Sequence, residues 1–154
     1  MLKVGDTAPA FDSLDTQGQP ISLAQFAGRP LVLYFYPKDR TPGCTTEARD
    51  FRDLRSEFEA LGAAIVGVSR DSVASHQKFT EVECLPFNLI ADTDESVCQA
   101  YGVIGEKVSF GKTSIGLIRT TYLIDAEGKI AQVWSPVTVK DHAAVVLEAV
   151  RKLA

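Results

Sequence analysis

LVLYFYPKDRTPGCTTEARDF, residues 31 to 51, is the stretch that decides the fold of this chain. It opens with a near-continuous apolar run, residues 31–37, which predicts a central strand covered on both faces. From Cys44 onward, apolar residues recur every three or four positions as far as Leu61, which predicts an amphipathic helix ended by Gly62. A strand that leads directly into such a helix is typical of α/β domains.

The segments on either side continue this alternation of apolar runs and helical spacing. Upstream, residues 10–26 place the turn TQGQP between short apolar pieces, which predicts an outlying N-terminal hairpin. Downstream, the pattern predicts a strand over 63–69, a helix from Asp71 or Ser72 to about Glu83, a strand over 86–92, a short helix over 94–102, a polar loop over 106–117, a hairpin of 119–125 with 129–134, and a helix over 139–153. This order is compatible with a thioredoxin-like α/β fold, a mixed central sheet flanked by helices with an N-terminal hairpin.

Length and composition fit one globular domain over residues 1–154. Hydrophobic residues make up 45% and charged residues 23% of the chain, the balance of a folded soluble protein. Sixteen Lys and Arg against twenty Asp and Glu give a net charge of −4, and no basic run occurs. We therefore expect no nucleic acid and no membrane as partner. The start of the chain lacks an apolar signal segment, so we expect a cytoplasmic protein.

The chain contains three cysteines, Cys44, Cys84 and Cys98. So few cysteines argue against a secreted disulfide framework and leave room for catalytic or redox-active thiols. His76 and His142 form no short Cys/His spacing of the zinc type, so we expect no metal or other cofactor and interpret both as solvent-facing helix residues. The C-x-x-C pair of a disulfide oxidoreductase is absent, because Glu47 holds its second position.

Cys44 occupies the first turn of its predicted helix, where backbone N–H groups lack partners within the helix. These donors and the helix dipole favour the thiolate over the thiol. Pro42 restricts Thr41 to an extended conformation, and Gly43 lets a ligand approach the backbone closely. The Thr41 hydroxyl can then bond whatever the thiolate attacks. Taken alone, Cys44 is equally compatible with a small buried residue at a helix start.

The longer string FYPKDRTPGCTTEARDF resembles the active-site segment of the peroxiredoxins. Their pattern Pro-x-x-x-Thr-x-x-Cys is met by Pro37, Thr41 and Cys44. Within that family the chain is most similar to the bacterioferritin comigratory protein group, also called the Q type. The similarity covers nearly the whole length, through GDTAPAF near the start, GVSRDS at 67–72, LPFNLIADTDESV at 85–97 and IRTTYLID at 118–125.

The resemblance implies a thiol peroxidase that reduces hydrogen peroxide and organic hydroperoxides. At the matching positions, Cys44 is the peroxidatic cysteine and Thr41 is the hydroxyl that binds the peroxide. Arg119 matches the arginine that stabilises thiolate and transition state. The expected substrate site also includes Pro37, Gly43 and Glu47.

Two of these residues also have a simpler interpretation. From its position alone, Arg119 would be a charge at a strand edge that reaches solvent or pairs with a carboxylate. Glu47 would be a first-turn carboxylate that complements the helix dipole.

The sulfenic acid formed on Cys44 must be reduced before further oxidation inactivates it. Many Q-type proteins carry the resolving cysteine five positions after the peroxidatic one, but here that position is Arg49. Other members place it in the helix after the second core strand, which makes Cys84 the preferred resolver and thioredoxin the implied reductant. Cys98 is interpreted mainly as core, and a one-Cys enzyme recycled by an external thiol stays open.

The resemblance also implies a monomer whose partners are peroxide substrates and a thiol reductant. A rival hypothesis is a thioredoxin-fold sensing or binding module, in which slow oxidation of Cys44 signals to a partner protein. The set of Thr41, Cys44 and Arg119 favours catalysis, and the rate of reaction with peroxide discriminates between the two.

Overall fold

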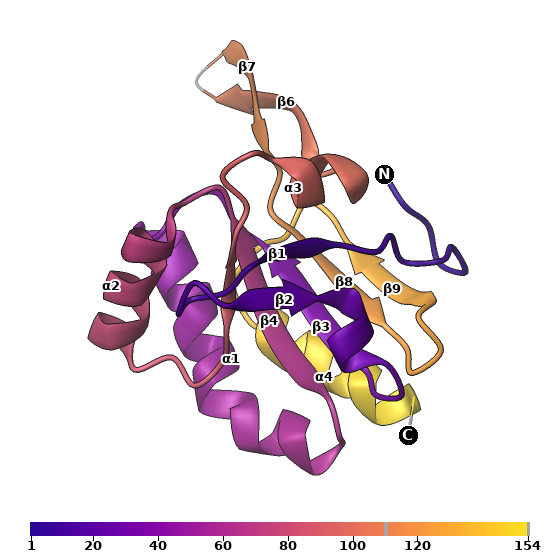
Figure 1. Ribbon diagram of the computed structural model, residues 1–154. Coiled ribbons are helices and arrows are strands. Elements are labelled where there is room, and N and C mark those ends of the chain that lie inside the picture. Colours follow the sequence, from indigo (N-terminus) through magenta and orange to yellow (C-terminus); the bar gives the residue numbers. More distant parts are fainter. Residues whose placement is uncertain (110, 154) are drawn as a thin grey trace.

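The computed structural model describes residues 1–109 and 111–153. Its central element is a mixed sheet of five strands (Figure 1). In chain order its strands are β3 (Leu31–Phe35), β4 (Ala64–Ser69), β5 (Leu89–Ala91), β8 (Thr120–Ile124) and β9 (Ile130–Trp134). Across the sheet the order is β5-β4-β3-β8-β9, with β4 parallel to β3 and β5, and β8 antiparallel to β3 and β9. The apolar run that opens the decisive stretch is therefore a central strand, as predicted.

Alternate residues of β3 enter two separate hydrophobic cores. Leu31, Leu33 and Phe35 face one core, while Val32 and Tyr34 face the other. The second core lies under three helices, α1 (Pro42–Ala60), α2 (Val73–Glu83) and α4 (His142–Leu153). The first core lies under the hairpin of β1 (Asp12–Leu14) and β2 (Pro20–Ser22), the 3-10 helix η1 (Leu23–Phe26) and α3 (Ser96–Ala100). Figure 1 shows that hairpin in front of the sheet and α4 behind it, which confirms the predicted thioredoxin-like architecture.

The ends of α1 and α2 follow from local residues. Pro42 is the first residue of α1 after the N-cap Thr41, a position where its missing N–H costs nothing. Ser72 caps α2, because its hydroxyl accepts a hydrogen bond of 3.1 Å from the Ser75 N–H. The C-cap of α2 is Cys84, which adopts a left-handed conformation with φ of 53°. A non-glycine residue there is strained.

The prediction of a polar loop over 106–117 is wrong. Strands β6 (Ile104–Ser109) and β7 (Lys112–Leu117) pair antiparallel in a hairpin that projects from the body of the protein (Figure 1). Val108 is 75% exposed and Ile115 69% exposed, so solvent reaches most of the hairpin and its sequence lacks the alternation of a half-buried strand. Phe110, which belongs to the same stretch, lies outside the described residues.

Both histidines are buried, so their assignment to solvent-facing positions is also wrong. His76 has no exposed surface, and its two ring nitrogens lie 2.7 Å from Asp39 Oδ2 and 2.9 Å from the Ile90 carbonyl oxygen. His142 Nε2 lies 2.8 Å from the hydroxyl of Thr121. The pattern of each helix could not reveal these partners, because they come from distant segments.

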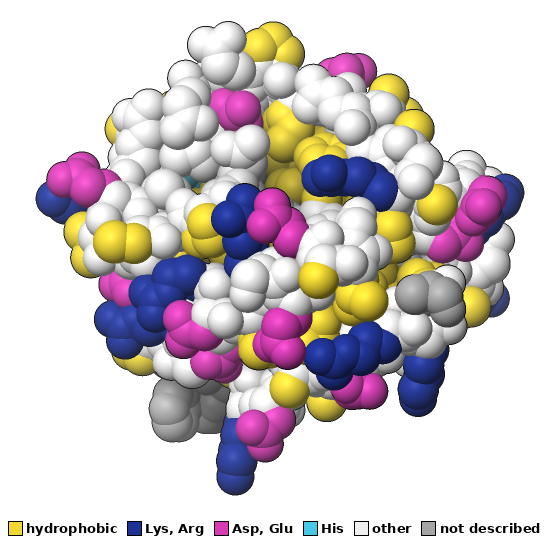
Figure 2. All heavy atoms as spheres, turned by 90° about the horizontal axis from the view of Figure 1, so that it is seen from below, with side chains coloured by type: hydrophobic (Ala, Val, Ile, Leu, Met, Phe, Trp, Pro, Cys, Tyr) yellow, Lys and Arg dark blue, Asp and Glu magenta, His cyan; other side chains and the backbone are white. Residues whose placement is uncertain are grey.

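Acidic and basic side chains are interspersed over one end of the molecule. Figure 2 shows them in pairs and small groups, with apolar surface between them. Within α1, Arg55 Nη2 and Glu59 Oε1 form an ion pair 2.9 Å apart.

Candidate active site

Cys44 lies in the first turn of α1, at the carboxyl end of the central strand. Its side chain is buried, with 1% of its surface exposed. The N–H groups of Gly43 and Cys44 have no carbonyl partner within the helix, because they belong to its first turn. The Thr41 side chain does not cap them; its hydroxyl donates instead to the Lys38 carbonyl oxygen at 2.9 Å. These N–H groups are therefore available to a ligand beside the sulfur.

Arg119 connects the sulfur to a buried carboxylate. It lies in the short link between β7 and β8, where its carbonyl oxygen accepts a hydrogen bond of 2.9 Å from the Val137 N–H. Its Nη2 donates to Cys44 Sγ at 3.2 Å, and its Nη1 donates to Glu47 Oε1 at 2.6 Å. The structure thus brings together three of the residues that the resemblance assigned to the site. A cation that donates directly to the sulfur is a feature of reactive cysteine sites.

Glu47 has an unusual electrostatic environment. Burial raises its pKa from 4.5 to about 7, although the neighbouring Arg119 opposes the shift. Among the residues that the structure describes, none donates a hydrogen bond to Glu47 Oε2. Burial lowers the pKa of Arg119, but its interactions with Glu47 and Cys44 outweigh burial and hold that pKa above its usual value. Arg119 therefore stays charged, while Glu47 changes its protonation near neutral pH.

Gly43 allows the guanidinium of Arg119 to lie against the first turn of α1. A Cβ built on Gly43 would lie 3.3 Å from Arg119 Nη2, closer than most such contacts. A side chain at position 43 would therefore require the guanidinium of Arg119 to shift by a few tenths of an ångström. This explains the glycine before Cys44 in structural terms.

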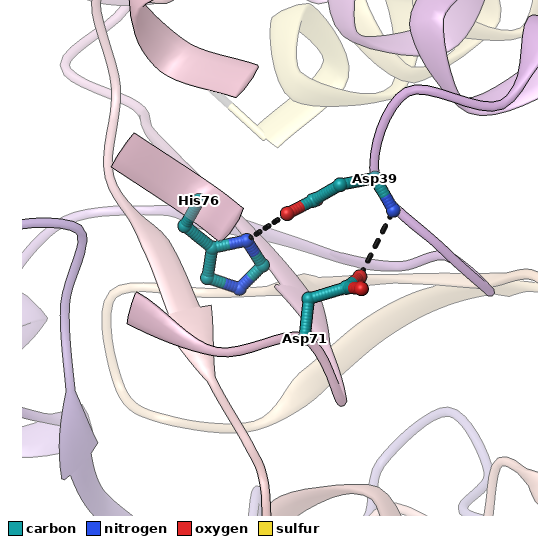
Figure 3. A group of neighbouring side chains, drawn as sticks. All are labelled: Asp39, Asp71 and His76. Carbon is teal, nitrogen blue, oxygen red and sulfur yellow. Dashed lines mark hydrogen bonds and ion pairs between the residues drawn. The ribbon is translucent and has the colours of Figure 1, made fainter. Parts of the chain in front are cut away.

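The loop between β3 and α1 is anchored through Asp39. Its N–H donates to Asp71 Oδ2 at 2.9 Å, and its Oδ2 receives a hydrogen bond of 2.7 Å from His76 Nδ1 (Figure 3). The hydroxyls of Tyr36 and Ser75 also donate to the Asp39 carboxylate, at 2.6 and 2.8 Å. We call these five residues the Asp39 network. Sequence reasoning missed it, because no motif links its separate segments.

The same network groups three side chains of metal-ligating type. One ligand atom each from Asp39, Asp71 and His76 lies within 4.8 Å of the others. However, Asp71 Oδ2 already accepts hydrogen bonds from the Asp39 N–H and the Ser69 hydroxyl, and both nitrogens of His76 face acceptor oxygens. Hydrogen bonding within the protein therefore explains this cluster without a cation.

Pro37 lies half-buried in the anchored loop, and its predicted contact with substrate stays a prediction. The other two cysteines differ sharply in accessibility. Cys84 is an exposed free thiol at the end of α2, whereas Cys98 is a free thiol buried in α3. Burial raises the pKa of Cys98 well above its usual range, which agrees with its interpretation as a core residue.

The raised pKa of Glu47 predicts a pH-dependent stability. An acid whose folded pKa exceeds its unfolded value contributes stability below pH 4.5, and that contribution is lost as the pH rises through about 7. Glu47→Gln removes this ionisation, so its stability should not fall in the same way. We expect the free energy of unfolding of Glu47→Gln, minus that of the wild type, to be about 2 kcal/mol larger at pH 8 than at pH 5. Urea unfolding at both pH values measures this difference.

The matched control is Glu59→Gln, an exposed carboxylate on the same helix. Its stability relative to the wild type should change little between the two pH values. A Glu47→Gln variant that behaves like this control would contradict the assigned ionisation.

Comparison with known proteins places this geometry in a family. A model of the AhpC/TSA family matches residues 4–133. A putative peroxiredoxin bcp of Coxiella burnetii is 47% identical over 146 residues, 95% of this chain and 97% of that protein. The peroxiredoxin Bcp of Bacillus subtilis is 43% identical over 153 residues, covering 99% of this chain and 98% of its own.

Solved structures agree with these relatives. A cysteine-to-serine mutant of PrxQ from Xylella fastidiosa superposes with a TM-score of 0.93 at 36% identity, over 99% of this chain and 97% of that one. The bacterioferritin comigratory protein of Xanthomonas campestris, described for its alkyl peroxide reduction activity, gives 0.88 at 45% identity, over 92% and 90%. The chain therefore belongs to the AhpC/TSA family and is a peroxidase of its peroxiredoxin Bcp or Q group.

Proposed function

We propose that the Cys44 thiolate reduces hydrogen peroxide and organic hydroperoxides. The observation that supports this assignment most directly is the Arg119 guanidinium, which donates to the Cys44 sulfur at 3.2 Å and to Glu47 at 2.6 Å. This arrangement holds a cation beside a buried thiol at a helix N-terminus, the kind of environment in which reactive cysteines occur.

The reaction requires donors at the oxygen that leaves. The sulfur attacks one peroxide oxygen, the O–O bond breaks, and negative charge develops on the other oxygen. Arg119 and the free N–H groups of Gly43 and Cys44 can stabilise that charge. The Thr41 hydroxyl donates to Lys38, so its lone pairs can accept a hydrogen bond from the peroxide O–H. The leaving oxygen then takes up a proton from the solvent, so the products are Cys44 sulfenic acid and an alcohol, or water when the substrate is hydrogen peroxide.

The next step in this proposal joins Cys44 to Cys84. The Cys84 thiol attacks the sulfenic sulfur, a disulfide forms, and the oxygen leaves as water. Disulfide geometry needs Cα atoms about 4.4 to 6.8 Å apart. Because Cys44 is buried in the first turn of α1 and Cys84 is exposed at the end of α2, we expect that first turn to unwind. The exposure of Cys84 at a helix end supports its choice over the buried Cys98. Thioredoxin or another thiol then reduces the disulfide.

Peptide mass mapping tests this cycle. The protein receives one equivalent of hydrogen peroxide with a sulfenic-acid trap present and its disulfides preserved. A peptide linking Cys44 and Cys84 is the expected product. Trapped sulfenic acid on Cys44 alone would favour a one-Cys enzyme, and no rapid change at Cys44 would favour the sensing module.

Cys84→Ser should separate the two half-reactions. We expect single-turnover oxidation of Cys44 to keep its wild-type rate, because Cys84 lies outside the peroxide site. Thioredoxin-dependent steady-state turnover should lose most of its rate, because no intramolecular disulfide forms. Cys98→Ala is the control and should retain both rates. Unchanged turnover in Cys84→Ser would argue against Cys84 as the resolver.

The remaining parts of this proposal concern the molecule as a whole. In the described part of the chain, no helix combines the length and the apolar character needed to cross a membrane. We propose a cytoplasmic monomer that meets small peroxides and a thiol reductant. Gel filtration with light scattering tests the monomer.

A further inference from the structure

Beside the hydrophobic core that α1 and α2 share, two sets of polar contacts connect the α1 segment to α2, one at each end of α2. The Asp39 network joins the loop before α1 to the first turn of α2. At the other end, Arg49 Nε and Nη2 donate to the two carboxylate oxygens of Glu83, at 2.6 and 3.3 Å. Arg52 Nη1 donates to the Glu83 carbonyl oxygen at 2.8 Å. We call Arg49, Arg52 and Glu83 the α1–α2 clamp.

The clamp is adjacent to both thiols of the proposed cycle. Glu83 directly precedes Cys84, the exposed C-cap of α2. Arg49 follows Cys44 by five residues, a rise of about 7.5 Å along the axis of α1. The clamp therefore holds the chain beside Cys84 at a point about one and a half turns away from Cys44.

We propose that Glu83 is a positioning residue whose ion pair with Arg49 controls how readily Cys84 reaches Cys44. This inference rests on the proposed disulfide step. Cys84 cannot move along α1 toward Cys44 without pulling its bonded neighbour Glu83 away from Arg49. Unwinding of α1 from its first turn also disturbs the pair, because the N–H of Arg49 is held by the carbonyl one turn earlier.

Burial decides which of the two connections opens. The side chains of His76 and Asp39 are 0% and 1% exposed, and breaking their buried hydrogen bond would leave polar groups without partners, which is costly. In the clamp the Glu83 side chain is 10% exposed but the Arg49 side chain is 53% exposed, so water reaches one partner of the pair and weakens it. The left-handed conformation of Cys84 adds strain at the same end of α2. Opening is therefore confined to the end of α2 and the first turns of α1, while the start of α2 stays fixed.

Glu83→Gln and Arg49→Gln test the clamp from its two sides. Each variant removes one charge and leaves both thiols and the peroxide site in place. We expect disulfide formation after a single peroxide pulse to become about two- to fivefold faster in both. At high peroxide, both should accumulate less Cys44 sulfinic acid, because resolution competes better with further oxidation. Glu59→Gln, which removes half of the Arg55 pair within α1, should leave both quantities unchanged.

A simpler explanation would be that each variant changes the ionisation of the Cys84 thiol. The opposite charges of Arg49 and Glu83 allow this explanation to be tested. Loss of the Glu83 carboxylate favours the Cys84 thiolate, whereas loss of the Arg49 cation disfavours it. An effect on thiol ionisation would therefore move the two variants in opposite directions, and that result would overturn the proposal. A weaker clamp instead makes disulfide formation faster in both variants. The double variant should form the disulfide little faster than either single variant, because each already removes the same ion pair.

Amide hydrogen exchange of the reduced protein tests the clamp without any disulfide. The first turns of α1 should exchange faster in both variants than in the wild type and the Glu59→Gln control. If the wild type forms no link between Cys44 and Cys84, the disulfide step of the proposed function is wrong, and faster exchange would still establish the clamp. Unchanged exchange in both variants would refute it.

Discussion

Cys44→Ser is expected to reduce peroxidase activity to the uncatalysed background. A serine hydroxyl stays protonated at neutral pH where the thiolate is the attacking species, and oxygen cannot pass through the sulfenic acid on which the cycle depends. The loss should appear in single-turnover peroxide consumption as well as in steady-state turnover. Both should fall for hydrogen peroxide and for an organic hydroperoxide alike.

We expect Cys44→Ser to remove the thiol without disturbing the rest of the structure. Cys44 is buried, and serine replaces one atom with a slightly smaller one, so the fold and the contact with Arg119 should remain. Thermal unfolding and far-UV circular dichroism check that the variant is folded. Cys98→Ala, which removes a buried thiol from α3, is the matched control and should keep wild-type activity. Near-wild-type turnover in Cys44→Ser would reject the proposed mechanism.

The sequence predicted the elements whose signals are local. The run that became β3 and the periodic helix after it were identified because both faces of the strand and one face of α1 are buried. Ser72 was one of the two caps foreseen for α2, and its hydroxyl forms the expected bond. The hairpin of β6 and β7 was missed, because backbone pairing with little burial leaves no apolar period to find.

The site likewise contains residues with a local signal in the sequence and residues without one. Cys44 at a helix start was visible from Pro42 and Gly43 next to it, whereas Arg119 was assigned only through the family resemblance. Its partner Glu47 is 72 positions away in the sequence, and such a pair exists only once the sheet is formed. The sequence also did not predict that His76 is buried against Asp39, because the two residues are 37 positions apart and meet only in the folded structure.

Arg119→Gln should have the second largest effect, lowering kcat/KM for peroxide by about a hundredfold or more. The variant loses the cation that donates to the Cys44 sulfur and that is placed to stabilise the leaving oxygen. Arg119→Lys should recover only part of the rate, because an ammonium group lacks the planar fork that bonds Cys44 and Glu47 together. Stopped-flow measurement of Cys44 oxidation tests both variants, with Arg55→Gln on the exposed side of α1 as the control.

Loss of Arg119 also leaves the buried carboxyl of Glu47 without its partner, so a slow variant could be slow because it is poorly folded. The double variant Arg119→Gln, Glu47→Gln separates these causes, since replacing both members of a buried pair costs far less stability than removing one. We expect the double variant to unfold nearer the wild-type temperature at pH 8 while its peroxide rate stays as low as that of Arg119→Gln. A double variant that regained most of the wild-type rate would show that Arg119 serves only to neutralise Glu47 and takes no part in peroxide reduction.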